Sequence, residues 1–425
     1  MRTLPFERSE PVAGVRLVTE SMPHVRSVSI GLWVDVGSRD ETDDIAGASH
    51  FLEHLLFKGT ARRSAQDIAE AFDAVGGEIN AYSAREHTCV YGRVLDADLP
   101  MAIDILGDMF HEAALRFDEV ESERRVVLEE IHMAGDVPED RVHDLFASTA
   151  WPGHALGRPV LGTEQTVGGM SRDRIEQFYR RGYVPDRLVV AAAGNISHES
   201  LTSHVRAAFR NGTEAKRRSA QGAARFGGPR AAYDTRDSEQ VHLVWGVESV
   251  GRSDPDRYAQ SVMSVLYGGG LSSRLFQEIR EKRGLAYSIY SADHMYLECG
   301  SFTVYAGTHS SNAAEVLKIV RDEASKVVGG DLSEEEVERA KGHVRGGLVL
   351  SMDDPGGRMS RLGRSELVHG EVLSVNELLA KVDAVSKEDV QRIAERVFGG
   401  EGAVLASVGP VAEGSLDFAV EPLAH

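Results

Sequence analysis

The stretch VVLEEIHMAGDVPEDR, residues 126–141, resembles HVRGGLVLSMDDPGGR, residues 343–358, and the alignment pairs Pro138 with Pro355. Two further segment pairs occur in the same order along the chain: SVSIGLWV (27–34) with QVHLVWGV (240–247), and RLVVAAAG (187–194) with GAVLASVG (402–409). Chance similarity explains one such pair more easily than three in the same order. The sequence therefore predicts one structural unit used twice.

Each copy spans about 200 residues, an ordinary domain length. We expect a first domain over residues 1–212, a linker over 213–230 and a second domain over 231–425, because the linker run is polar and has no apolar period. Within each copy, alternating strand-like segments are mixed with helical segments of period 3.6 without strict βα alternation. This pattern predicts an α+β fold with helices on one face of a mostly antiparallel sheet.

Composition narrows the classes of function. The 425 residues carry a formal charge of −19, which disfavours nucleic-acid binding and favours cationic partners such as basic peptides and metal ions. The same charge is also explained by solubility alone. Two cysteines, Cys89 and Cys299, cannot build a disulfide framework, and no run approaches the ~20 apolar residues of a membrane span. With no signal-peptide pattern at Met1, we expect a cytoplasmic protein with no membrane partner.

The segment AGASHFLEHLLF contains two histidines one helical turn apart, His50 and His54. We expect Asp43 or Asp44 to begin this helix, whose imidazoles can then face one metal ion. Glu53 shares that face and can accept a proton from water acidified by the metal. The alternative, a buried helix with incidental histidines, would leave several polar groups buried without partners. The pattern is the inverted H-x-x-E-H motif and predicts a zinc site.

A third protein ligand is expected on the helical segment 117–136. Glu123 and Glu130 lie two turns apart on one face, whereas Glu129 is rotated by about 100°. We predict Glu130 as the ligand and Glu123 as a carboxylate that orients the site from outside. Without the histidine motif, all three would be interpreted as solvated helix acids. The motif does not occur in the second copy, so one zinc per chain is expected.

HFLEHLLFKGT followed by ERRVVLEEI resembles the pitrilysin family of inverted-motif zinc peptidases, most closely its mitochondrial processing peptidase-like branch. GGEINAYSAREHT (76–88) resembles the family's edge-strand segment, which implies that Asn80 and the backbone at Ala81 help to bind an extended peptide. LSSRLFQEIREKRGLAYS (271–288) resembles the segment carrying an Arg and a Tyr that bind substrate backbone, here Arg280 and Tyr287. WPGHALGRPVLGT (151–163) also matches, without an assignable role.

The resemblance implies a half-length zinc metalloendopeptidase that hydrolyses unfolded or extended peptides inside a chamber formed by two chains. A homodimer is expected, and a heterodimer with a related subunit is the other arrangement. In such a chamber the Arg/Tyr segment facing a metal site comes from the opposite unit. The rival function is a non-catalytic structural or partner subunit of a processing-peptidase-like complex. That rival predicts a damaged motif, whereas His50, Glu53, His54 and Glu130 are all present.

Overall fold

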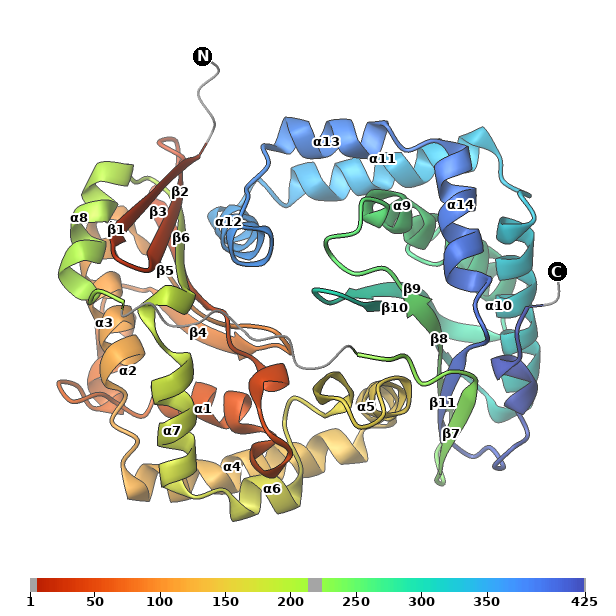
Figure 1. Ribbon diagram of the computed structural model, residues 1–425, viewed down its shortest axis with the longest axis horizontal. Coiled ribbons are helices and arrows are strands. Elements are labelled where there is room, and N and C mark those ends of the chain that lie inside the picture. The colour runs from red at the N-terminus through yellow and green to blue at the C-terminus, as the bar shows by residue number, and fades with distance from the viewer. Residues whose placement is uncertain (1–5, 213–223, 424–425) are drawn as a thin grey trace. The chain divides into compact units, whose positions relative to one another are not determined.

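The computed structural model describes residues 6–212 and 224–423, so residues 213–223 of the predicted linker lie outside the described part. The chain forms two compact units. Of the described residues, the first unit comprises 6–132, 159–212 and 349–374, and the second comprises 133–158, 224–348 and 375–423. Each unit thus takes most of its residues from one half of the sequence and one segment from the other (Figure 1).

The first unit contains a six-stranded sheet in the order β1-β2-β6-β3-β5-β4. Its strands are β1 (Glu7–Val12), β2 (Val15–Ser21), β3 (Ser27–Val34), β4 (Glu78–Ser83), β5 (Thr88–Leu95) and β6 (Leu188–Gly194). Neighbouring strands are antiparallel except for the β2–β6 pair. Among the described residues β4 pairs only with β5, which makes β4 an edge strand.

Most helices of the first unit cover one face of this sheet and enclose the main apolar core. They are α1 (Ala48–Leu56), α2 (Ala65–Asp73), α3 (Leu99–Glu112), α4 (Phe117–Asp136), α6 (Glu164–Gly169), α7 (Arg172–Gly182) and α8 (His198–Ala208). The fully buried Phe51, Leu52 and Leu55 of α1 belong to this core. Burial of one such side chain contributes about 1.5–3 kcal/mol to the stability of the fold. Together these side chains fix α1 against the sheet.

The opposite face of the sheet is covered by α12 (Pro355–His369), which comes from the second half of the sequence (Figure 1). Trp33 donates its indole N–H to the sulfur of Met359 at 3.4 Å. Gly363 lies so close to Trp33 that a β-carbon there would fall 2.1 Å from the indole nitrogen. The fully buried Glu366 accepts hydrogen bonds from Arg8 and Arg16. Close packing and these ion pairs hold α12 in place.

The second unit repeats this plan with a five-stranded sheet in the order β7-β11-β8-β10-β9. Its strands are β7 (Arg230–Thr235), β8 (Val241–Ser249), β9 (Ala286–Met295), β10 (Gly300–Thr308) and β11 (Val404–Gly409). Its own helices are α9 (Arg257–Tyr267), α10 (Ala313–Val328), α11 (Glu334–Leu350), α13 (Val375–Asp383) and α14 (Lys387–Phe398). The β7–β11 pair is parallel, as the β2–β6 pair is in the first unit.

The second sheet is covered on one face by α5 (Pro138–Ala150), which comes from the first half of the sequence. The two exchanged helices, α5 and α12, begin at Pro138 and Pro355, the prolines that the repeat pairs. The predicted fold class and the internal repeat are therefore confirmed. The exchange of one helix between the units, which adds a helix to the face of each sheet that was expected to be uncovered, was not predicted. No helix of the described chain combines the length and the apolar character needed to cross a bilayer.

Candidate metal centre

Helix α1 starts at Ala48, directly after Gly47, whose φ of 94° is in the left-handed region that favours glycine. The expected start at Asp43 or Asp44 is wrong, because these residues belong to a separate 3₁₀ turn. The buried Glu41 replaces them as the cap. Its carboxylate accepts hydrogen bonds from the backbone N–H of Gly47 at 2.8 Å and of Ser49 at 2.6 Å. A negative charge at a helix N-terminus also interacts favourably with the helix dipole.

Glu41 thus fixes the start of the helix that carries both histidines. We expect Glu41→Ala to lower the free energy of unfolding by about 2–4 kcal/mol, because two buried N–H donors lose a charged acceptor. Urea denaturation followed by circular dichroism measures this change. Asp43→Ala is the matched control, with an expected effect within about 0.5 kcal/mol because Asp43 is exposed. A larger effect for Asp43 than for Glu41 would contradict this account of the cap.

The three predicted ligands lie together. His50 and His54 each direct Nε2 at the same carboxylate oxygen of Glu130, at 3.4 and 3.5 Å respectively. All three candidate ligand atoms lie within 4.8 Å of one another. Ligand atoms about 2.1 Å from a tetrahedral zinc ion are about 3.4 Å apart, so the group fits zinc with a fourth position left over. Glu129 is exposed, as the helical phase predicted.

Burial changes the acid–base properties of this group. Burial and the neighbouring His54 lower the pKa of His50 to about 4, so its imidazole is neutral near pH 7 and available to a metal. Burial raises the pKa of Glu53 above its ordinary value, although hydrogen bonding to Ser83 opposes the rise. One Glu53 oxygen is buried with no hydrogen-bond partner among the described residues. A carboxylate in this environment is a stronger base than an exposed one.

Glu123 lies behind His54, and only 5 % of it is exposed. Its carboxylate is 3.2 Å from Nδ1 of His54 and 2.7 Å from the ammonium group of Lys58. The side of His54 that faces away from Glu130 therefore has a carboxylate partner. In contrast, Nδ1 of His50 is buried without a hydrogen-bond partner in the described chain.

The predicted peptide-binding residues of the first unit lie on the edge strand β4, which packs against α1. Ser83 at its end donates a hydrogen bond to the carbonyl of Ser49 at 3.1 Å. Asn80 is exposed, and its side-chain oxygen accepts the backbone N–H of Ala81 at 2.8 Å. A peptide that pairs with this N–H must first displace the Asn80 side chain.

Arg280 and Tyr287 lie together in the second unit. The guanidinium group of Arg280 donates to the carbonyl of Tyr287 at 3.0 Å and lies 4.5 Å from the centre of its ring. Phe276 stacks on the same guanidinium at 4.8 Å, from the start of a π-helical turn, η6 (Phe276–Glu281). Tyr287 is 77 % exposed. The pair therefore presents a fixed cation and an accessible ring to solvent.

Sequence patterns assigned no role at the site to Glu41, Ser83 or Phe276, and they marked Lys58 only as a possible end of the histidine helix, which ends at Leu56. Helical spacing carries a signal for two of them, because Lys58 follows His54 by one turn and Phe276 precedes Arg280 by one turn. No local pattern identifies Glu41 or Ser83, which reach α1 through tertiary contacts. Trp151 and Leu156 of the segment 151–163 are buried in an apolar cluster of the second unit, whereas the end of the segment belongs to the first unit. There the backbone of Leu161 and Gly162 closely approaches Gly47.

The described residues thus form two similar α+β units with one candidate metal centre, the His-His-Glu group on α1 and α4, and these features define a class of two-domain proteins. Comparison with known families shows to which family the chain belongs. Residues 16–164 match the model described as Insulinase (Peptidase family M16), and residues 169–343 match the Peptidase M16 inactive domain. The chain belongs to the M16 family of peptidases, which confirms the resemblance to inverted-motif zinc peptidases.

Two relatives and one solved structure illustrate the relationship. An uncharacterized zinc protease of Streptomyces coelicolor is 48% identical, over 94% of this chain and 88% of its own. An uncharacterized zinc protease of Bacillus subtilis is 38% identical, over 93% of this chain and 96% of its own. The crystal structure of a protease from Helicobacter pylori has a TM-score of 0.90 and 20% identity, and covers 96% of this chain and 100% of its own. This last likeness shows the fold alone.

Proposed function

We propose that this protein is a zinc metalloendopeptidase that hydrolyses unfolded peptides or extended segments, with one zinc ion per chain. The observation that carries the proposal is the convergence of His50, His54 and Glu130 beside the half-buried carboxylate of Glu53. Two imidazoles and one carboxylate are a typical donor set for catalytic zinc, and three protein ligands leave one position open. The rival assignment, a non-catalytic partner subunit, gives no reason for an intact donor set.

In this mechanism His50, His54 and Glu130 hold the metal. Zinc bound there supplies a Lewis acid that polarises the scissile carbonyl and acidifies water. Glu53 accepts the proton of the attacking water and then transfers it to the leaving amine nitrogen. Burial raises the pKa of Glu53, which makes its carboxylate a better acceptor of this proton. Glu123 holds the His54 ring from behind.

The substrate is held through its backbone. An extended peptide added to the free edge of β4 gains main-chain hydrogen bonds with little sequence preference, beside the helix that carries the histidines. The formal charge of −19 favours basic peptides among these substrates. We further propose that two chains enclose a chamber that excludes folded proteins. The cytoplasm stays the expected location, on the basis of cysteine usage.

The proposal is tested by metal analysis together with mass-spectrometric mapping of cleavage in a panel of basic and neutral peptides. We expect one zinc per chain, cleavage that stops when a chelator removes the metal, and recovery when zinc is restored. His50→Ala and His54→Ala should each release the metal. Zinc binding without cleavage of any peptide in the panel would favour the non-catalytic partner subunit instead.

The role of Arg280 and Tyr287 gives a separate prediction about the dimer. If each site combines the metal of one chain with the Arg/Tyr segment of the other, an Arg280→Ala/Tyr287→Phe variant and a Glu53→Gln variant are each inactive alone. After subunit exchange, a mixed dimer contains one intact site. Random pairing makes about half the dimers mixed, so recovery reaches at most about a quarter of wild-type activity.

Peptide cleavage is measured before and after mixing, and exchange is followed separately by native mass spectrometry of differently tagged chains. A rise above both parents supports the shared site. No rise despite demonstrated exchange would place Arg280 and Tyr287 in the same chain as their metal. A monomer that cleaves peptides would remove the dimeric chamber from the proposal.

A further inference from the structure

Glu123 is held from two sides. One carboxylate oxygen faces Nδ1 of His54 at 3.2 Å, and the other faces the ammonium group of Lys58 at 2.7 Å. The side chain of Glu123 is 7 % exposed, whereas that of Lys58 is 33 % exposed. Among the contacts of the described chain, Lys58 touches neither Glu130 nor the two histidine Nε2 atoms that face Glu130. Its contact with the metal group therefore runs through Glu123.

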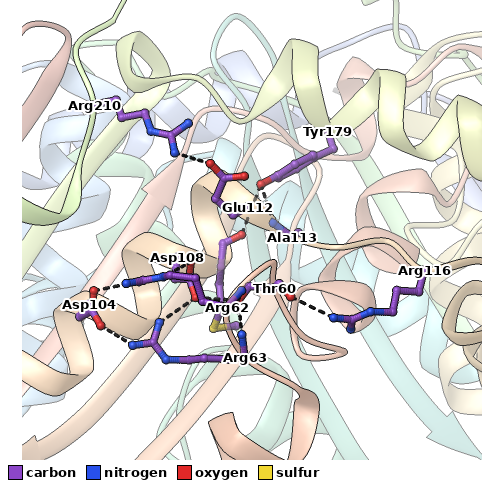
Figure 2. Close-up of polar contacts among 11 residues, drawn as sticks. Thr60, Arg62, Arg63, Asp104, Asp108, Glu112, Ala113, Arg116, Tyr179 and Arg210 are labelled. Atoms are coloured by element: carbon purple, nitrogen blue, oxygen red, sulfur yellow. Dashed lines mark hydrogen bonds and ion pairs between the residues drawn. The ribbon is translucent and has the colours of Figure 1, made fainter.

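The backbone around Lys58 is fixed independently of the metal group. Arg116 donates to the carbonyl of Lys58 at 3.4 Å and to the carbonyl of Thr60 at 3.1 Å. The Thr60 hydroxyl donates to the buried Asp108 at 2.6 Å. Figure 2 shows the part of this network around Thr60, where Asp104 and Asp108 of α3 also bind Arg62 and Arg63 of the same loop. The loop after α1 is thus anchored, and Lys58 projects from an ordered backbone.

We propose that Lys58 is a positioning residue of the metal centre: it fixes the Glu123 carboxylate against Nδ1 of His54 and so keeps Nε2 of His54 directed at the metal. The inference rests on the proposed function, since it concerns the same zinc site. Only His54 of the two histidines has this support among the described residues, because Nδ1 of His50 has no hydrogen-bond partner there. Carboxylates behind ligating histidines fix ring orientation, and their loss typically lowers metal affinity 10–100-fold.

Two effects of removing Lys58 oppose each other. Loss of a positive charge near a divalent cation favours metal binding, but the Lys58 charge is already compensated by Glu123 at 2.7 Å. The second effect is that Glu123 loses one of the two groups that hold its carboxylate. A buried carboxylate without a neighbouring cation is costly in free energy. We therefore expect the orientational effect to dominate and zinc affinity to fall.

The test measures zinc affinity directly, by competition with a chromophoric chelator and without any peptide. Lys58→Met is expected to weaken zinc binding about 10-fold, the lower end of the range for such partners. Lys58→Arg, which keeps the charge, should recover most of that loss. Arg125→Met is the matched control, because it removes the same charge from an exposed position on the helix that carries Glu123. Its zinc affinity should equal that of the wild type.

A second readout separates positioning from general destabilisation. In zinc-loaded, ¹⁵N-histidine-labelled protein, the proton on Nδ1 of His54 should exchange with water faster in Lys58→Met than in the wild type, while the corresponding resonance of His50 is unchanged. Equal zinc affinity in Lys58→Met and wild type, or no recovery in Lys58→Arg, would overturn the proposal. A wild-type protein that binds no zinc would overturn the proposed function as well, so the two failures are distinguishable.

Discussion

Replacing Glu53 with glutamine is expected to leave zinc bound and to slow peptide cleavage by about 10²–10⁴-fold, the range that general-base catalysis contributes. Glutamine keeps the size and packing of the side chain but cannot accept the proton of the attacking water. The three metal ligands are untouched by the change, because Glu53 is not one of the converging atoms of His50, His54 and Glu130. The chemical step should therefore be lost while the site remains assembled.

The measurement combines zinc content with kcat on a peptide that the wild-type protein cleaves. Glu70→Gln, an exposed carboxylate on α2, is the matched control and should keep both properties. If Glu53→Gln lost its metal, Glu53 would be a ligand and the assignment of roles would be wrong. If it kept full activity, another group would act as the base.

The fold was predictable from repeated segments because both copies preserve the same strand and helix order. The pairing of Pro138 with Pro355 even marks the start of the two exchanged helices. The exchange itself could not be predicted. A helix with one apolar stripe packs equally well on either of two similar sheets, and only tertiary contacts such as Trp33 with Met359 decide between them.

The candidate site likewise has features that could be predicted from the sequence and features that could not. Helical geometry places His50 and His54 on one face and distinguishes Glu130 from Glu129. That the two helices meet was expected only because a two-histidine zinc site needs a third protein ligand. The start of α1 was not, because the local sequence offers Asp43 and Asp44 as caps while Glu41 reaches the helix through the fold. Sequence patterns report contacts along one helix, and they do not report contacts made across a loop.

Substitution of Glu130 is expected to have the second large effect, a loss of zinc affinity. We expect Glu130→Gln to weaken zinc binding by more than about 100-fold, beyond the 10–100-fold range of residues outside the coordination shell. The carboxylate oxygen lies 3.4 Å from Nε2 of His50 and 3.5 Å from Nε2 of His54, the spacing of neighbouring ligands on a tetrahedral ion. An amide at this position keeps the shape but loses the negative charge that offsets a divalent cation between two neutral imidazoles.

Glu129→Gln is the matched control, since it makes the same chemical change one residue earlier on α4, at an exposed position. Its zinc affinity is expected to stay within about twofold of the wild type, because surface substitutions usually change free energies by less than about 0.5 kcal/mol. Chelator competition measures both variants under one set of conditions, and circular dichroism checks that each remains folded. The reverse order of effects would mean that Glu129 faces the histidines in solution and that the helical phase of α4 is shifted by one residue. Equal, small effects would remove α4 from the coordination shell and leave the metal with two protein ligands.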